Sequence, residues 1–408
     1  MTDVENPAAL TARGSSWGQR EGRATTFAAM RRMVVLGMAA GVFSCLFVLS
    51  FGYAQHSPRP HGVRIDVVAS VGAVNQVRRQ LAAAVPGGFD VRQVSTEALA
   101  RQHLQHMSTS GALVDTAGGA LWVLTASAEG LPLQQAVDQA LSGVARAQGR
   151  EVQLVDVVAL PERDRAGLSA FALEVGLLVP AVIGAIGFFL MGRRARVWIR
   201  VLGAVVYAVV AAGLAVVMLD AVLGALTGSP WVLFGDAVII AAAFVLSVAA
   251  LHCLLGLQGT AIAAGALIVV GNAVNGAAVP TSMLPDGYRQ IAPWMPNNAA
   301  VHLARSDLYF AGDTQGGPLL TLSIWLAAAV LIVVATDLIH VRLCRATPHR
   351  APVIHATSLA AHLRARRNAV RHDARQDTVS EPTTPQATTA APLRGLVADA
   401  ARAGSSAA

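Results

Sequence analysis

Six long apolar runs alternate with polar segments along this chain, and each is long enough to cross a bilayer, which takes about 20 residues. They cover residues 33–54, 171–191, 199–220, 234–256, 258–279 and 319–341. The first run stands apart, because residues 55–168 of mixed polarity separate it from the second. The pattern predicts an α-helical polytopic membrane protein with six transmembrane helices.

Residues 55–168 follow the shorter periods of a folded domain. Alternating or continuous apolar positions indicate strands at 63–70, 89–94, 120–127 and 151–158. Between them, Val74, Val77 and Leu81 recur at helical spacing, residues 96–107 are suited to a second helix, and a third apolar stripe begins at Leu133. The order strand–helix–strand–helix–strand–helix–strand predicts a small α/β domain between transmembrane helices one and two.

Composition supports the membrane assignment, since 54% of the residues are hydrophobic and only 13% are charged, against about 25% in soluble domains. The chain has no lysine, so arginine alone sets the orientation. Arginines cluster before the first run, between the second and third, and after the sixth: Arg31, Arg32, Arg193, Arg194, Arg196, Arg200, Arg342, Arg345 and Arg350. We therefore expect a multi-pass plasma-membrane protein with both termini cytoplasmic and the α/β domain extracytoplasmic.

This orientation divides the chain into segments. Residues 1–32 form a cytoplasmic N-terminal segment, either a surface helix or a disordered leader. Residues 33–54 are the first transmembrane helix; an uncleaved anchor is favoured over a signal peptide because 30 polar residues precede it. The α/β domain spans 55–168, a five-helix transmembrane domain spans 169–345, and 346–408 is a basic, largely disordered tail suited to anionic lipid or a cytoplasmic partner.

A proline-punctuated segment interrupts the transmembrane domain on the outer side. Its four prolines lack an N–H and divide it into short pieces: Pro280, Pro285, Pro293 and Pro296. We expect short helices at 286–292 and 297–310, the second capped by Asn297 or Asn298, ended by Gly312, and carrying Arg305 near the edge of its apolar stripe. Residues 280–312 are therefore interpreted as a re-entrant segment and a candidate gate.

A few polar residues within the apolar runs are candidate functional groups. Three acids belong to the outer half of the helices: Glu174, Asp220 and Asp236. They are either a proton or cation site or ordinary interfacial groups. Asn272 and Asn275, three residues apart in "GNAVNG", either bond a neighbouring helix or line a polar pathway.

The sequence excludes several kinds of chemistry. An orthodox Walker A loop needs a lysine, so any ATP hydrolysis would occur in a separate subunit. No nucleophile–base signature, cofactor motif or nucleic-acid-binding pattern is apparent, and we expect no enzyme activity in this chain. His103 and His106 in "HLQH" lie one helical turn apart, but an exposed helix face explains them better than a metal site.

The broken segment carries a resemblance. A proline after a glycine-rich run, then "LP", then "P-x-x-P" and a helix with one arginine resembles permease subunits of the type-2 ABC transporter superfamily. One span, a large external domain and five further spans is similar to its phage-infection-protein branch. "LWVLTASAEGLPLQQAVDQALSGVARAQGREVQLVDVVALPERDRAGLSAFAL" and "MLPDGYRQIAPWMPNNAAVHLARSDLYFAG" look like the junction and re-entrant segment of members from high-GC Gram-positive bacteria.

The resemblance implies an exporter permease that pairs with a second copy or a related permease and moves an amphiphilic substrate with a separate ATPase subunit. The candidate inner-face coupling loop is the link bearing Arg193, Arg194, Arg196 and Arg200. Two features depart from the family pattern: the junction has Ala159 and Ala166 where members commonly have proline, and no distinct coupling helix is apparent. The alternative is a non-transporting membrane scaffold or receptor that binds an extracytoplasmic partner through its α/β domain.

Overall fold

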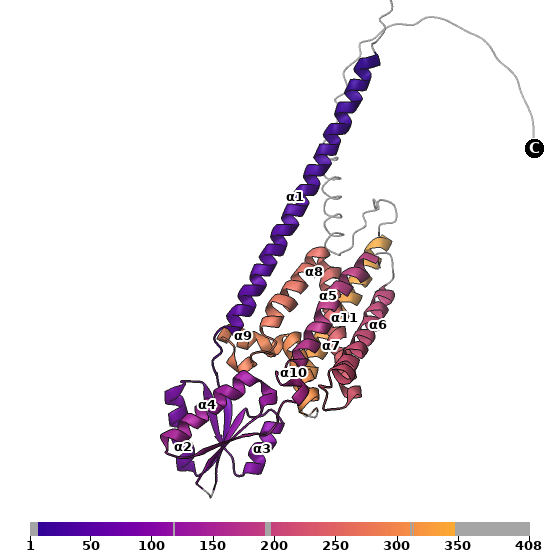
Figure 1. Ribbon diagram of the computed structural model, residues 1–408. Helices are drawn as coiled ribbons and strands as arrows, with labels where there is room; N and C mark the ends of the chain where they lie inside the picture. Colours follow the sequence, from indigo (N-terminus) through magenta and orange to yellow (C-terminus); the bar gives the residue numbers. More distant parts are fainter. Residues whose placement is uncertain (1–6, 117–118, 192–196, 311, 313, 347–408) are drawn as a thin grey trace, which may run out of the picture. The chain divides into compact units, whose positions relative to one another are not determined.

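The structure is a computed structural model that describes residues 7–116, 119–191, 197–310, 312 and 314–346. Arg193, Arg194 and Arg196 of the candidate coupling loop, and the tail beyond Ala346, lie outside the described residues. Within the described part, helices predominate, and one five-stranded sheet is formed by the stretch of chain between the first helix and the later ones (Figure 1).

The long apolar helices account for five of the six expected spans. Five helical stretches are long and apolar enough to cross a membrane: Ala29–Gln55, Ser169–Gly187, Val197–Val222, Pro230–Leu255 and Gly316–Ile339. They belong to α1 (Pro7–Gln55), α5 (Ser169–Met191), α6 (Val197–Val217, continued by a π-helix Met218–Val222), α7 (Pro230–Leu255) and α11 (Gly316–Ala346). The chain is a multi-pass membrane protein by the length and composition of these helices.

The fifth expected span, 258–279, is not one continuous helix. It consists of α8 (Leu257–Ala264) and a π-helix (Gly265–Gly271), and helical geometry ends at Ala273. The fifteen residues of its apolar helix, Leu257–Gly271, rise about 22 Å, less than the roughly 30 Å of a bilayer core. Five of the expected spans are therefore full-length helices, and the fifth expected span is a shorter helix that the chain leaves after Ala273.

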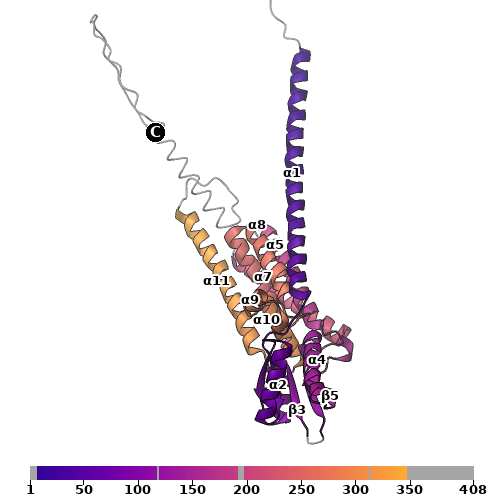
Figure 2. The same ribbon diagram turned by 90° about the vertical axis from the view of Figure 1, so that its left-hand side faces the viewer.

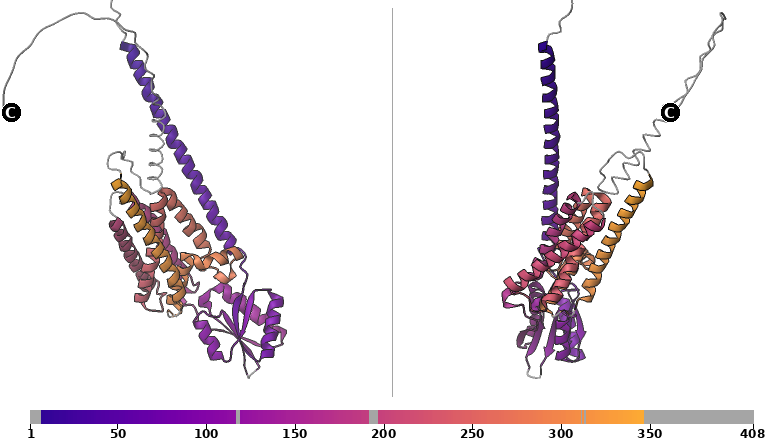
Figure 3. Two further views of the ribbon diagram at one scale, coloured as in Figure 1. Left: turned by 180° about the vertical axis from the view of Figure 1, so that it is seen from behind. Right: turned by 90° about the vertical axis from the view of Figure 1, so that its right-hand side faces the viewer.

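α7 is the central helix of the bundle. It contacts α5, α6, α8, α10 and α11, and the long helices of the bundle lie side by side in Figure 2 and Figure 3. Two-thirds of the residues in its most apolar stretch are buried, against 22% in the corresponding stretches of α6 and α11. α1 differs, since only 6% of its most apolar stretch is buried. It meets the rest of the chain at its C-terminal end, where Ser50 Oγ lies 2.9 Å from the Tyr288 hydroxyl.

The α/β domain confirms the four expected strands and adds a fifth. The strands are β1 (Val63–Val68), β2 (Phe89–Gln93), β3 (Gly111–Asp115), β4 (Leu121–Thr125) and β5 (Val152–Asp156), in the order β2-β1-β3-β4-β5. All pairs are parallel except β3 with β4. β3 was not predicted, because four of its five residues are buried and no alternation marks it.

Three helices cover the sheet, with α2 (Val71–Ala84) and α4 (Leu131–Ala147) in contact on one face. α4 buries the whole expected stripe of Leu133, Val137, Leu141 and Val144. Gly111 of β3 lies directly under α4, where a Cβ would be 2.4 Å from Val137. α3 (Glu97–Gln105) contacts β1 and β3, and its buried residues share a core with the membrane helices (Figure 1). Leu81 of α2 and Val137 of α4 share a second core with Val274 and Met283, so both faces of the sheet share a core with the membrane domain.

Candidate functional site

The broken segment after Gly271 is the most unusual part of the membrane domain. It contains the 3₁₀ turns Thr281–Met283 and Ala292–Trp294, α9 (Asp286–Ile291) and α10 (Pro296–Tyr309). Each expected proline stands just before one of these pieces or at its first or second residue: Pro280, Pro285, Pro293 and Pro296. The prediction of short helices separated by prolines is confirmed, since proline suits the first helical turn and no later position.

Backbone buried in a membrane protein needs hydrogen-bond partners, and two side chains of α10 supply them here. Asn298 Nδ2 donates to the carbonyl oxygens of Val274 and Asn275 at 3.2 and 3.3 Å. Arg305 Nη1 and Nη2 donate to the carbonyl oxygens of Gly276 and Ala277 at 3.2 and 3.0 Å. Four consecutive carbonyls that a helix would have satisfied are therefore held by α10, and we call Asn298 and Arg305 the carbonyl clamp.

The carbonyl clamp corrects one expectation about α10. Neither asparagine caps the helix, because the N-cap position is Met295 and no side chain bonds there. Arg305, expected near the edge of the apolar stripe, is buried, since only 2% of it is accessible. Gly312 does end the helix as expected: its φ is +83° and its N–H donates to the Ser306 carbonyl at 3.0 Å.

A buried carboxyl ties the segment to α5. Glu174 is fully inaccessible, and it accepts hydrogen bonds from Asn297 Nδ2 at 2.5 Å and from Asn275 Nδ2 at 3.3 Å. Asn275 also donates to Asn272 Oδ1 at 3.4 Å. The candidate acid and the candidate amides therefore meet in one network. Among the described residues Glu174 forms no ion pair, so neutral amides alone solvate its carboxyl group.

A second carboxyl cluster lies where α7, α10 and the start of α11 meet. Gln315 Nε2 donates to Asp307 at 2.5 Å and to Asp236 at 3.3 Å. Asp236 and Asp307 are both buried, at 7% and 4% accessibility. The sequence singled out Asp236 but not Asp307, because Asp307 belongs to a helix outside the apolar runs. The third candidate acid, Asp220, is exposed on the π-helix after α6 and joins neither cluster.

The α/β domain and the link that follows it contact the broken segment through further polar and charged groups. The Tyr309 hydroxyl donates to the Asp164 carboxylate, which also accepts from the Leu168 and Ser169 backbone at 3.0 and 3.1 Å. Burial opposes the charge of Asp164, but these hydrogen bonds outweigh it, so the pKa of Asp164 lies below its ordinary value. Gly130 packs on Pro280, where a Cβ would be 2.7 Å from the ring.

Glu129, in the 3₁₀ turn Ser127–Glu129, is a second acid where the α/β domain meets α10. Burial raises the pKa of Glu129 from 4.5 to about 7, while the hydrogen bond from Ser110 at 2.9 Å and the charge of Arg305 act in the opposite direction. Neither Glu129 nor Asp164 was singled out from the sequence, although both lie in the junction segment that resembles the permease family. The clamp arginine thus faces both the broken backbone and an acid of the α/β domain.

Other expected features have simpler roles. Arg200, the described residue of the candidate coupling loop, lies 3.6 Å from Asp337 of α11. His103 Nδ1 lies 2.6 Å from Asp66, a buried acid that Arg92 also contacts at 2.9 Å. In the part of the chain that the structure describes, no three histidine, cysteine or acidic residues are grouped as a metal site.

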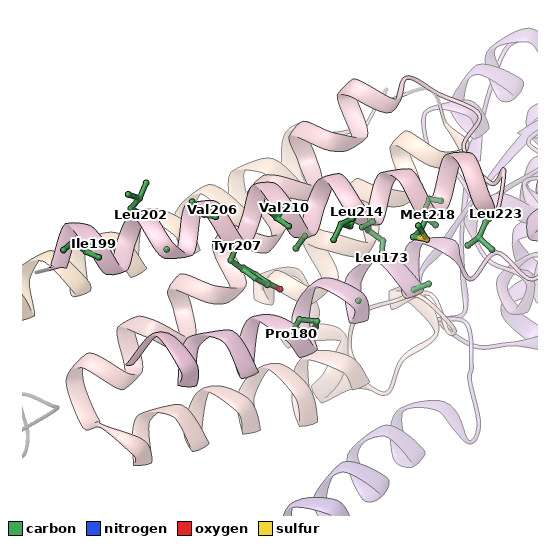
Figure 4. A pocket seen from close by; sticks show the side chains of 16 residues that line it. Leu173, Pro180, Ile199, Leu202, Val206, Tyr207, Val210, Leu214, Met218 and Leu223 are labelled. Carbon is green, nitrogen blue, oxygen red and sulfur yellow. The ribbon is translucent and has the colours of Figure 1, made fainter. Parts of the chain in front are cut away.

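An apolar groove of about 950 Å³ runs between α5 and α6 (Figure 4). Large side chains of α6 line it along its length, among them Leu202, Val206, Val210 and Leu214, while α5 contributes Leu173 and Pro180. Tyr207, its main polar lining residue, donates its hydroxyl hydrogen to the Leu177 carbonyl at 2.8 Å. The sequence did not indicate this groove, because both helices read as uniformly apolar.

These features define the class: a multi-pass membrane protein whose broken helical segment is held by buried polar side chains. Comparison with known proteins adds no family, since no family model matches the chain and no curated protein matches it.

Proposed function

We propose that this chain is the membrane-spanning permease subunit of a type-2 ABC-like exporter, which moves an amphiphilic substrate with a separate ATPase subunit. The observation that carries the proposal is the carbonyl clamp. Residues 274–277 have left helical geometry at a buried position, and among the described residues the side chains of α10 hold their carbonyls. Such a segment can change conformation without unwinding a helix, which suits a gate.

In this proposal the chain crosses the membrane six times, and the fifth crossing is the broken one. α8 turns back along α7 after Gly256, which has φ +70°, and the residues after Gly271 complete the distance that this helix lacks. The arginine distribution then places both termini in the cytoplasm and the α/β domain outside. The domain meets the gate through Asp164–Tyr309 and Gly130–Pro280, so a substrate or partner bound outside could act on it.

Affinity capture from native membranes tests this function. We expect a nucleotide-hydrolysing subunit to be captured with the intact chain. Substituting Arg193, Arg194 and Arg196 together with alanine should abolish that association while the protein remains in the membrane. A charge-matched control substitutes the exposed Arg59, Arg79 and Arg165, which should leave association unchanged.

Two outcomes would contradict the proposal. Capture of a secreted or cell-wall protein through the α/β domain, with no hydrolase, would favour the scaffold or receptor function. Unchanged hydrolase association in the first variant would remove the arginine loop from the coupling role. A second copy of the chain in the captured complex would support a homodimeric permease.

A further inference from the structure

The groove between α5 and α6 is hollow because small residues of α5 line one side of it. α5 contributes Ala172, Gly176 and Pro180, which recur every four residues on one helix face. α6 contributes large aliphatic side chains that are largely exposed. Gly176 leaves real space, since an added Cβ there meets no atom within 4 Å. A long, flexible apolar ligand would be surrounded on two sides.

The groove extends across the apolar part of a bilayer. Nineteen residue steps separate Ile199 from Met218, which gives about 29 Å of helix, close to the thickness of a hydrocarbon core. Trp198 precedes this stretch and Trp231 begins the next helix; both are strongly exposed, at 57% and 82%. Exposed tryptophans mark the headgroup levels of a membrane, so the groove lies at the depth of acyl chains.

A charged group stands at the end of the groove nearest the α/β domain. Leu223 lines that end, and the next residue, Gly224, is covered by the Arg163 side chain. A Cβ on Gly224 would be 2.2 Å from Arg163 Nη1, and its φ of +59° also favours glycine. Arg163 is exposed, and within the described ranges it forms no hydrogen bond or ion pair, including with its neighbour Glu162 or with Asp220.

An apolar groove with an unpaired arginine at its mouth is complementary to a particular kind of molecule. Guanidinium groups bind phosphate through two parallel hydrogen bonds, and arginine is attracted to anionic headgroups at the membrane surface. We propose that the α5–α6 groove binds a phosphate-bearing anionic lipid, with its acyl chains along α6 and its headgroup at Arg163. The inference rests on the proposed function only in treating such a lipid as the cargo.

Photo-crosslinking with matched lipid probes tests the groove. The full chain is placed in vesicles containing phosphatidylglycerol or phosphatidylcholine with the same diazirine-bearing acyl chains, and labelled peptides are mapped by mass spectrometry. We expect the phosphatidylglycerol probe to label α5 and α6 about fivefold more than the phosphatidylcholine probe, the preference that one arginine near a headgroup provides.

Substitutions at two positions test the binding of the lipid headgroup and of the acyl chains separately. Arg163→Gln should abolish the phosphatidylglycerol preference while labelling continues, and Arg163→Lys should retain part of it. Gly176→Leu should fill the groove and reduce labelling of α5 and α6 by both probes. The matched controls are Arg165→Gln, an exposed arginine two residues away, and Gly235→Leu on α7, where an added Cβ also meets nothing; both should label like the unaltered chain.

Several results would overturn the inference. Equal labelling by the two probes, unaffected by Arg163→Gln, would mean ordinary boundary lipid. Protein–protein crosslinks from α5 or α6 to a second copy would mean that the groove is a subunit seam. Because the assay measures binding in vesicles without an ATPase, failure to find a coupled hydrolase would count against the exporter proposal and leave this result standing.

Discussion

Arg305 is a single residue that takes over the bonding of a broken helix. Its two terminal nitrogens bond the carbonyls of Gly276 and Ala277, and its charge faces Glu129. An exposed arginine on an amphipathic helix would be replaceable. A buried one that holds two carbonyls is not, because its removal leaves those acceptors without partners.

Arg305→Leu is therefore expected to destabilise the protein by about 3 kcal/mol, since two buried acceptors are left unsatisfied at roughly 1–3 kcal/mol each. Thermal unfolding of the detergent-solubilised protein measures the loss. Arg289→Leu is the control, because the side chain of Arg289 bonds Asp286 of its own short helix, at 2.5 Å, and no other side chain among the described residues. An equal change in both variants would argue against the carbonyl clamp.

Glu129 makes the stability of the junction depend on pH. A carboxyl whose pKa is higher in the folded protein binds its proton more tightly when folded. Its contribution is therefore present below pH 4.5 and is lost as the pH rises to about 7. Between pH 4.5 and about 7, the melting temperature of the unaltered protein should therefore fall relative to that of Glu129→Gln. A pH-independent difference would contradict the raised pKa of Glu129.

At the scale of elements, the turn between α7 and α8 depends on close packing at one glycine. Gly259 lies so near the preceding helix that a Cβ would be 1.8 Å from the Leu251 carbonyl oxygen. Gly265, six residues later in the same apolar stretch, has nothing within 4 Å of that position. The two glycines of one stretch therefore have opposite requirements, although the sequence presents them alike.

Gly259→Ala should destabilise the protein by about 1–3 kcal/mol through overpacking. Gly265→Ala should be neutral or slightly stabilising, because alanine is the better helix former and meets no neighbour. Thermal unfolding of the two variants side by side provides the comparison. If both behave alike, α8 does not pack on α7 as the structure shows.

Elements also differ in how well the sequence predicts them. The helices α2 and α4 and the breaks at the prolines were predicted correctly, because amphipathic spacing and a missing N–H act locally. β3 and the end of the fifth apolar run were not. β3 is buried without alternation, and the helix ends where Asn275 Oδ1 accepts from the Ala277 N–H at 3.0 Å and distant side chains bind the backbone. A local pattern contains no information about such partners.

At the scale of the molecule, the orientation is a separate question from the fold. Trp294 is 75% exposed and Arg305 is buried, although both belong to the broken segment. If this segment is extracytoplasmic, Trp294→Cys in a background without native cysteines should react with an impermeant maleimide added to intact cells. Arg305→Cys should stay unreacted until the protein is unfolded.

The control for this labelling is Glu162→Cys, an exposed position next to the α/β domain, which should react from the same side as Trp294→Cys. Reaction of Trp294→Cys only after the cells are opened would reverse the orientation. The proposed direction of transport and the cytoplasmic position of the arginine loop would then both be wrong.

The apolar runs, the strand and helix periods of residues 55–168 and the prolines determined that this is a multi-pass membrane protein with an inserted α/β domain and a broken segment, because hydrophobic length and backbone donors are properties of short stretches. Only the tertiary structure decided that Glu174 meets Asn275 and Asn297, that Asp236 is joined by Asp307, and that Arg305 holds the carbonyls of Gly276 and Ala277. The reason is physical: a buried polar group is satisfied by whichever partner folding brings to it, and these partners lie up to 123 residues away.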